Sequence, residues 1–369
     1  MNEKEIALGF FRQYYENADL DIPEIEKREF GIGNIKKIDA RHLSFANTAE
    51  FRSYLVSNTP MFVSHSTAYY QFPGATPIQK KVWTGADLVF DLDIHAEGKY
   101  GAYALLDAVK ADAIRLVEEF LAADFGIAKK DITINFSGNR GYHIHVRDAR
   151  YQEIGSDERK EIIDYIMGTG LNYRNFFEEE EVMARVARLR GPKPDEAGYR
   201  GRFARAVMGT LEREPKAISR IFAKEDARKN FTDGIKEGNW SRTSLKANDL
   251  LVRLEPIARS LPLVSVNTDA GVTQDLSKLI RVPNSIHGET GLIAKKIENI
   301  EKFDPLRDAF VESKESGSEA IMKIKFSEDV PELRIKGEII GPFKKDEEKE
   351  MVKPVALFFV LKGSAAIIS

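Results

Sequence analysis

Cysteine is absent from this sequence of 369 residues. The absence excludes disulfide bonds, thiolate metal ligands and a cysteine nucleophile, so any bound metal must be held by oxygen or imidazole. Long apolar runs are also absent: the longest, such as "VALFFVL" near the C-terminus, fall well short of the ~20 residues of a membrane span. The first residues show no signal-peptide pattern. We therefore predict a cytoplasmic protein without a membrane partner.

Positive charge is concentrated in one part of the chain, although the net charge is only −3. Residues 181–250 contain sixteen Lys and Arg against ten Asp and Glu, and arginines alternate there with Tyr199 and Phe203 in "GYRGRFAR". A phosphate backbone would favour such a patch, because its neutralisation releases counterions. A solvated helical face explains the same charges. Both interpretations stay open at this point.

The hydrophobic pattern divides the chain into four parts. Residues 1–150 mix helical and strand patterns, and strand patterns return in residues 251–345. Residues 151–250 contain helical patterns such as "EVMARVARLR" and no convincing strand, which indicates an inserted, basic helical subdomain. Residues 346–369 are expected to form a C-terminal helical tail, whose apolar residues belong to the core rather than to a docking surface. The predicted fold class is therefore α+β.

Two aspartates interrupt the apolar run "DLVFDLDIH", residues 87–95. Alternate residues of a strand share a face, so Asp91 and Asp93 would lie side by side, ~7 Å apart. Without a partner the two carboxylates would repel each other and resist ionisation. A divalent cation removes this cost, and Mg²⁺ and Mn²⁺ prefer carboxylate oxygens. Taken alone, the pattern fits a solvent-facing edge strand equally well.

A second stretch, "NFSGNRGYHIHVRD" at residues 135–148, reads as two strands joined by a glycine-containing turn. The turn offers backbone N–H groups, the hydroxyl of Ser137 and the guanidinium of Arg140, with the imidazole of His143 close behind. These groups are typical phosphate ligands. An ordinary hairpin with histidines on its wet face is the alternative, and a purely structural role remains open for His145.

A third stretch, residues 267–291, supplies what such a site would still lack. It contains Asp269 at the end of an apolar strand pattern, followed by Arg281 and His287. One more carboxylate and two basic groups would complete a site for metal ions and a triphosphate. On its own, the stretch would read as a turn capped by Asp269 with basic residues at the surface.

Together the three stretches resemble the small catalytic subunit of archaeal and eukaryotic DNA primases. "VFDLD" looks like the metal-binding aspartate strand of that family, "SGNRGYHIHV" like its Ser-Gly-x-Arg-Gly-x-His motif, and "SIHGETGL" like its Ser-x-His-x-x-Thr-Gly motif. The 18 positions from Asp269 to His287 also match. "KREFGIG" followed by "IDARHLSF" resembles the opening of the family, in which Glu29 and Arg41 would lie close to the nucleotide.

The resemblance implies a mixed-sheet primase-type catalytic core with an inserted helical subdomain. It implies that Asp91, Asp93 and Asp269 are the catalytic residues and hold two Mg²⁺ or Mn²⁺ ions. The residues implied in triphosphate binding are Ser137, Arg140, His143, Arg281 and His287.

The implied enzyme is a nucleotidyltransferase, a DNA primase catalytic subunit that makes short RNA primers, with DNA primers as a second option, on single-stranded DNA for replication. A 3′-hydroxyl would attack the α-phosphorus of the incoming nucleotide, and no side chain would act as nucleophile. Two alternatives stay open: a primer-extending polymerase of the same superfamily, active in end joining or gap filling, and a non-catalytic nucleic-acid-binding subunit.

The implied partners are a single-stranded DNA template, ribonucleotide or deoxyribonucleotide triphosphates, and a large regulatory subunit in a heterodimer. The implied location is cytoplasmic and nucleoid-associated.

Two departures from the family pattern matter. Many members carry a cysteine-rich zinc-binding insertion, but this chain has no cysteine and His95 has too few neighbours of ligand type, so no zinc is predicted. Asn139 stands where some relatives have a second arginine, so one triphosphate contact should be weaker or supplied elsewhere.

Overall fold

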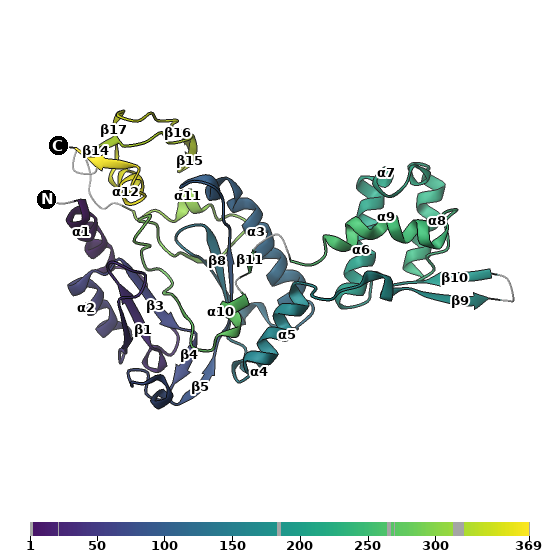
Figure 1. Cartoon of the computed structure of the whole chain (residues 1–369), viewed down its shortest axis with the longest axis horizontal. Coiled ribbons are helices and arrows are strands. Elements are labelled where there is room, and N and C mark those ends of the chain that lie inside the picture. Colours follow the sequence, from purple (N-terminus) through teal and green to yellow (C-terminus); the bar gives the residue numbers. More distant parts are fainter. Residues whose placement is uncertain are drawn as a thin grey trace. The chain divides into compact units, whose positions relative to one another are not determined.

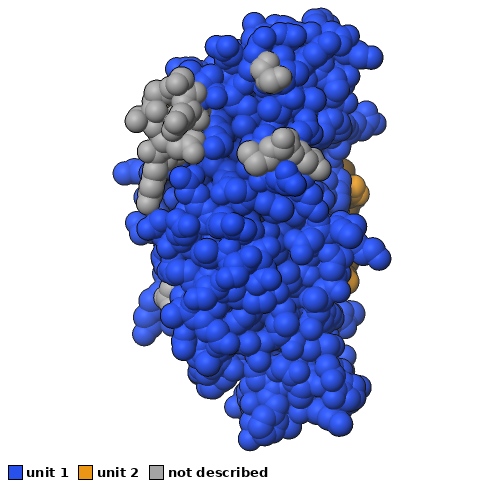
Figure 2. Space-filling model, turned by 90° about the vertical axis from the view of Figure 1, so that its left-hand side faces the viewer, with its two compact units in different colours: residues 1–114, 128–160, 266–369 blue, residues 115–127, 161–265 orange. Residues whose placement is uncertain are grey.

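A computed structural model describes residues 3–20, 22–182, 186–263, 267–268, 270–312 and 321–368. The chain forms two compact units, drawn in blue and orange in Figure 2. Unit 1 comprises Met1–Ile114, Ala128–Lys160 and Val266–Ser369, and unit 2 comprises Arg115–Ile127 and Glu161–Ser265. The four-part division of the sequence stays a prediction. The α+β class is confirmed, because helices accompany antiparallel sheets.

A five-stranded antiparallel sheet lies at the centre of unit 1 (Figure 1). Its strands, in spatial order, are β11 (Asn267–Thr268), β6 (Leu88–Asp93), β8 (Gly141–Val146), β7 (Ile132–Phe136) and β13 (Lys296–Ile297). Phe90 and Leu92 of β6 are fully buried, whereas Asp91 and Asp93 on its other face are half-buried. The alternation predicted for "DLVFDLDIH" is therefore confirmed, and it directs both carboxylates to one face.

A second antiparallel sheet has the order β12 (Leu279–Arg281), β3 (Phe62–Ser66), β1 (Phe30–Gly33) and β2 (Ala40–Leu43). Helices α1 (Glu3–Tyr15) and α2 (Thr48–Asn58) pack against it. Their shared core contains Phe11, Phe30, Phe51 and Leu55, all fully buried, and each such side chain contributes about 1.5–3 kcal/mol. Val63 of β3 belongs to this core, and β12, which carries Arg281, pairs with β3.

Most of the remaining elements of unit 1 are short, and α3 and α12 are the longest of them. They are β4 (Ala68–Tyr70), β5 (Trp83–Ala86), α3 (Leu106–Arg115, its last residue in unit 2), α4 (Ala149–Gln152), α10 (Ala270–Gln274), α11 (Pro305–Asp308), β14 (Ile321–Phe326), β15 (Leu333–Ile335), β16 (Glu338–Ile340), β17 (Glu348–Val352) and β18 (Ala365–Ile367). Helix α12 (Lys353–Leu361) is buried from Pro354 to Val360. The assignment of this apolar stretch to the core is confirmed, although strands flank the helix.

Helices dominate unit 2, namely α6 (Gly198–Arg213), α7 (Pro215–Ile218), α8 (Glu225–Lys236) and α9 (Ala247–Arg259). Helix α5 (Ser156–Ile166) belongs to both units. None of the helices in the described parts of the chain is long and apolar enough to cross a membrane.

The helix expected in "EVMARVARLR" is wrong, because this segment contributes to an antiparallel hairpin of β9 (Glu178–Val182) and β10 (Val186–Arg190). Nε of Arg190 lies 2.8 Å from Oε2 of Glu180 across the hairpin. The backbone N–H of Trp240 donates to the carbonyl of Leu189 at 2.9 Å. Partners this distant in sequence override a local helical pattern.

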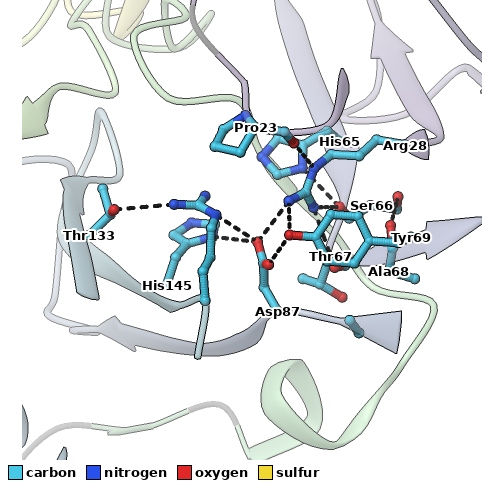
Figure 3. A network of polar contacts seen from close by, with 12 residues as sticks. Pro23, Arg28, His65, Ser66, Thr67, Ala68, Tyr69, Asp87, Thr133 and His145 are labelled. Atoms are coloured by element: carbon cyan, nitrogen blue, oxygen red, sulfur yellow. Dashed lines mark hydrogen bonds and ion pairs between the residues drawn. The ribbon is translucent and has the colours of Figure 1, made fainter. Parts of the chain in front are cut away.

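A buried network of polar side chains joins the two sheets of unit 1 (Figure 3). Arg28, just before β1, donates to Oδ2 of Asp87, just before β6, at 3.0 Å, and both side chains are fully buried. Tyr69 donates to the other oxygen of Asp87 at 2.5 Å. Arg28 also donates to the carbonyl of Ser66, at the end of β3, at 2.8 Å. The guanidinium thus ties β3 to the start of β6.

Two residues of the β8 strand region complete the network. Nδ1 of His145 lies 3.8 Å and Nε of Arg147 lies 3.3 Å from Oδ2 of Asp87. Arg147 also donates to Oγ1 of Thr133 on β7 at 3.1 Å. Burial alone would raise the pKa of Asp87, but Arg28, His145 and Arg147 together hold it below its usual range. The carboxylate therefore stays charged and anchors β6 to β8.

Asp87→Asn should lower the free energy of unfolding by ~3–5 kcal/mol, because the buried Arg28 and the half-buried Arg147 would lose their carboxylate. Denaturant unfolding monitored by circular dichroism measures the loss. The matched control is Asp329→Asn, which breaks the exposed ion pair with Lys344. This control should change stability little, since water screens exposed ion pairs. Equal losses in both variants would contradict an anchoring role for Asp87.

Stability should also fall as the pH drops below ~6.5, the ordinary pKa of histidine. Burial is the main reason that the pKa of His145 is lowered to about 4 in the folded chain. Between these two values the unfolded chain binds the extra proton, so acid favours unfolding. Denaturant unfolding at pH 8 and pH 5 should show a fall to which His145 contributes ~2 kcal/mol.

His145→Gln should reduce this fall, and His95→Gln, at an exposed histidine outside the network, is measured beside it as the matched substitution. An unchanged difference between pH 8 and pH 5 in His145→Gln would refute the assignment.

Candidate active site

The paired aspartates of β6 each contact a side chain of the Ser-Gly motif. Nε and Nη2 of Arg140 donate to both carboxylate oxygens of Asp93 at 3.0–3.2 Å. Nε2 of His143 lies 3.6 Å from Oδ1 of Asp91, to which it is also opposite in the β6–β8 register. The structure therefore brings together the first two predicted motifs. The two aspartate side chains retain exposed fractions of 23% and 29%, so a ligand can reach them.

The Ser-Gly turn presents polar groups in a fixed arrangement. Oγ of Ser137 accepts from the backbone N–H of Gly141 at 3.1 Å and of Asn139 at 3.4 Å. Because the oxygen accepts, its own hydrogen remains available as a donor. Gly138 has φ +81°, a left-handed conformation that glycine adopts without strain. A Cβ atom at this position would lie 2.8 Å from Cβ of His287, so the turn packs directly on the third motif.

His287 is held as a neutral hydrogen-bond donor. Burial and the charge of Arg281 lower its pKa well below the ordinary value. The backbone N–H of Glu289 donates to Nδ1 of His287 at 3.2 Å, so the ring proton resides on Nε2. Burial likewise lowers the pKa of His143 to about 3, with Arg281 as the next cause. Its contact with Asp91 is therefore not an ion pair at neutral pH.

Arg281 on β12 supplies a buried positive charge. Its guanidinium lies 5.6 Å from the ring centroid of Phe62, and that ring packs edge-on against His287. Burial lowers the pKa of Arg281 to about 10, while Tyr15, Glu289 and Asp91 oppose the shift. The guanidinium is still charged at neutral pH. Its Nη1 atom is buried and has no hydrogen-bond partner among the described residues, which suits an anionic ligand.

Glu29 and Arg41 form a separate cluster. Arg41 donates from Nε to Oε1 of the buried Glu29 at 3.0 Å, and the backbone N–H of His42 donates to the same oxygen. Nζ of Lys81 lies 3.5 Å from Oε2. Three positive or polar partners thus surround one carboxylate. The exposed fraction of the Arg41 side chain is 38%, which leaves it accessible. A role beside the nucleotide stays a prediction for both residues.

Asp269, the predicted third metal ligand, lies outside the described residues. Strand β11 ends one position before it, at Thr268, which pairs with Leu92 of β6. Among the residues that the structure describes, no three His, Asp or Glu side chains form a group that could hold a metal ion. Asp91 and Asp93 nevertheless fit a hard divalent cation, because they offer carboxylate oxygens on one accessible strand face.

The aromatic residues of the basic segment do not form a base-stacking surface. Tyr199 and Phe203 on α6 are buried. Arg202 is buried as well and pairs with Asp124 at 2.5 Å and with Glu119 at 3.2 Å. These three residues therefore stabilise unit 2, and they are not available to stack on bases.

Three further side chains at the site were not identified from the sequence pattern. Thr290 donates to the carbonyl of Gly138 at 2.6 Å and accepts from the N–H of Leu292, which locks the second and third motifs together. The threonine of the Ser-x-His-x-x-Thr-Gly motif is the sequence feature from which Thr290 could have been identified. Tyr103 donates to Asn139 of the Ser-Gly turn, and Lys362 donates to the hydroxyl of Tyr103. No local pattern indicates them, because their contacts span long sequence distances.

A mixed α+β core with paired acids beside clustered phosphate-seeking groups is typical of enzymes that transfer nucleotides with the help of metal ions. The model of the family "DNA primase small subunit" matches residues 90–298. This range contains both aspartates of the first motif and the whole of the other two motifs, but not Glu29 and Arg41.

Curated relatives share most of the chain. "DNA primase small subunit PriS" of Methanocella arvoryzae is 32% identical over an alignment of 394 residues, which covers 96% of this chain and 96% of the relative. The protein of that name from Methanothrix thermoacetophila is 36% identical, with 82% and 85% covered. The one from Methanococcoides burtonii is 34% identical, with 82% and 84% covered.

The chain therefore belongs to the DNA primase small subunit family. This membership confirms the resemblance found in the sequence, and with it the expectation of an enzyme: a nucleotidyltransferase that serves as a primase catalytic subunit.

Gly138→Ala should weaken nucleotide binding at least ~10-fold, because the new Cβ would displace His287 from the Ser-Gly turn. Isothermal titration with ATP and Mg²⁺ measures the affinity. Gly98→Ala is the matched control, since Gly98 has a similar φ of +74° but its Cβ would meet nothing within 4 Å. Equal affinities in the two variants would mean that the contact between turn and histidine is unimportant for binding.

Proposed function

We propose that unit 1 joins nucleotides on a single-stranded DNA template, with Asp91, Asp93 and Asp269 as catalytic residues. The observation that supports this most directly is the contact of Arg140 with Asp93 and of His143 with Asp91. These contacts unite the acid pair and the phosphate-seeking turn in one site. Asp269 enters the proposal from the sequence motif alone.

Asp91, Asp93 and Asp269 would hold two divalent cations, Mg²⁺ or Mn²⁺. When bound, such ions make a 3′-hydroxyl more acidic and neutralise charge on the transferred phosphate. The carboxylate chemistry fits them, because both ions prefer oxygen ligands. Arg140 neutralises Asp93 in the absence of other cations and is free to turn to a phosphate once that carboxylate has another partner.

The triphosphate would be bound by neutral donors and by charged groups together. Nε2–H of His287, the hydroxyl of Ser137 and the backbone N–H groups of the turn donate hydrogen bonds without a counter-charge. Arg140 and Arg281 add positive charge. Because these groups are already held in place by β8, β12 and the two packed turns, little ordering is needed on binding, and the α-phosphorus is kept in line with the attacking hydroxyl.

The proposed partners are inferred from the names of the relatives. "Small subunit" and "DNA primase" in those names support a larger partner subunit and a DNA template for this chain as well. We propose that the substrates are ribonucleotide triphosphates, with deoxyribonucleotides as an option, and that the complex is a cytoplasmic, nucleoid-associated heterodimer. A primer-extending polymerase of the same superfamily is the alternative, and the assay below separates the two.

Asp91→Asn and Asp93→Asn should each reduce nucleotide incorporation at least ~100-fold, because the site loses a metal ligand and stabilisation of the reacting charges. The measurement is synthesis of labelled oligonucleotides by the purified chain with nucleoside triphosphates and Mg²⁺ or Mn²⁺. Single-stranded DNA templates are supplied with and without an annealed primer.

Glu97→Gln is the matched control, since Glu97 is an exposed acid just beyond β6. It should retain wild-type incorporation. Product on unprimed template supports a primase, whereas product only on primed template supports either the polymerase alternative or a need for the larger subunit. Full activity in a folded Asp91→Asn chain would refute the proposed site.

A further inference from the structure

Lys362 lies at the end of α12, more than 200 residues from the Ser-Gly turn in sequence. Its side chain nevertheless contacts Tyr103, which bonds to that turn. Its Nζ donates to the hydroxyl of Tyr103 at 3.1 Å. The hydroxyl of Tyr103 in turn donates to Oδ1 of Asn139 at 3.2 Å. Asn139 directly precedes Arg140. A continuous chain of hydrogen bonds therefore links this lysine to the phosphate-seeking turn.

The ammonium group of Lys362 is held among aromatic rings rather than by an acid. It lies 4.8 Å from the ring centroid of Tyr103, 5.7 Å from that of Tyr100 and 6.0 Å from that of Phe358. No carboxylate among the described residues forms an ion pair with it. A lysine side chain is usually solvated or paired, so this half-buried charge lacks the counter-charge that would offset its desolvation.

Charges of both signs surround the ammonium group. Burial is the main reason that the pKa of Lys362 is lowered to about 8; Glu289 opposes the shift, and Arg140 and Lys99 add to it. The charge of Lys362 also contributes to the lowered pKa of His287. Positive groups from the Ser-Gly turn, from β12 and from the C-terminal end of α12 thus converge, and Nη1 of Arg281 has no hydrogen-bond partner among the described residues. Convergent positive charge of this kind favours an anion.

We propose that Lys362 is a further nucleotide-binding residue, which contacts the phosphate chain of the incoming nucleotide. Tyr103 is its positioning residue, because the tyrosine hydroxyl aims the ammonium group at the turn that contains Asn139 and Arg140. The proposal rests on the proposed function of this site as a nucleotide site. Asn139 itself carries no charge, so Lys362 supplies the positive charge on that side of the turn.

The test compares Lys362→Met, which keeps the apolar stem but removes the charge, with Lys362→Arg, which keeps the charge. Lys349→Met is the matched control, because Lys349 on β17 already has a counter-charge in Glu347, just before that strand. Lys362→Met should raise the KM for nucleotides ~10- to 100-fold, the range for one lost charge-assisted hydrogen bond. Its kcat should change by less than ~3-fold, since the lost contact serves binding. Lys362→Arg should recover much of the loss.

Direct binding separates a phosphate contact from a merely structural role. ATP and AMP are titrated, with Mg²⁺, into the full chain and its variants. Lys362→Met should weaken ATP binding much more than AMP binding, and Tyr103→Phe should do the same to a smaller extent. Equal weakening of both ligands, or none, would overturn the proposal. This binding experiment needs no turnover, so it judges Lys362 even if the wild-type chain synthesises nothing and the proposed function fails.

A measurement on the unaltered chain covers the case in which Lys362→Met does not fold. Acetylation of individual lysines by a brief pulse of reagent is followed by mass spectrometry with and without ATP and Mg²⁺. ATP should slow the modification of Lys362 several-fold and leave that of Lys349 unchanged. Equal rates at Lys362 with and without ATP would overturn the proposal independently of any variant.

Discussion

The buried ion pair of Arg28 and Asp87 is the interaction on which the rest of unit 1 depends. Arg28 precedes β1, Asp87 precedes β6, and His145 and Arg147 reach the same carboxylate from the β8 strand region. Two sheets are thereby fixed relative to each other by charges that water does not screen. The acid pair sits a few residues further along β6, and Arg281 lies on the other sheet, so this network sets the spacing of the whole site.

Electrostatics within the site follow from burial. His143 and His287 are neutral because their surroundings do not solvate a positive charge. Neutral imidazoles donate hydrogen bonds to phosphate without adding repulsion between the positive groups. The charged groups, by contrast, are arginines and a lysine held by aromatic rings or by Asp93. The site is thus preorganised for a highly charged anion. Binding of the anion removes the repulsion among the positive groups, which the fold tolerates because the buried network around Asp87 anchors it.

Family membership and geometry support one another at different levels. The relatives establish the class of enzyme across most of the chain. The geometry then shows how residues of the motifs depend on each other: Thr290 bonds to the carbonyl of Gly138, and Gly138 leaves room for His287. A motif glycine and a motif threonine therefore serve the same purpose, the fixed approach of two turns that carry phosphate-seeking groups. Lys362 extends this cluster with a residue from outside the motifs.

The sequence by itself determined the strand alternation of Asp91 and Asp93, the Ser-Gly turn, the α+β class and the family, because these depend on short patterns of residue type. It misjudged "EVMARVARLR", which pairs as strands and bonds to the backbone of Trp240, and it could not show that the aromatic residues Tyr199 and Phe203 of the basic segment are buried. Only the tertiary structure decided that Arg140 pairs with Asp93, that His145 belongs to the structural network, and that Lys362 is linked to the Ser-Gly turn through Tyr103. The physical reason is that burial and long-range contacts, rather than local pattern, set which charges meet.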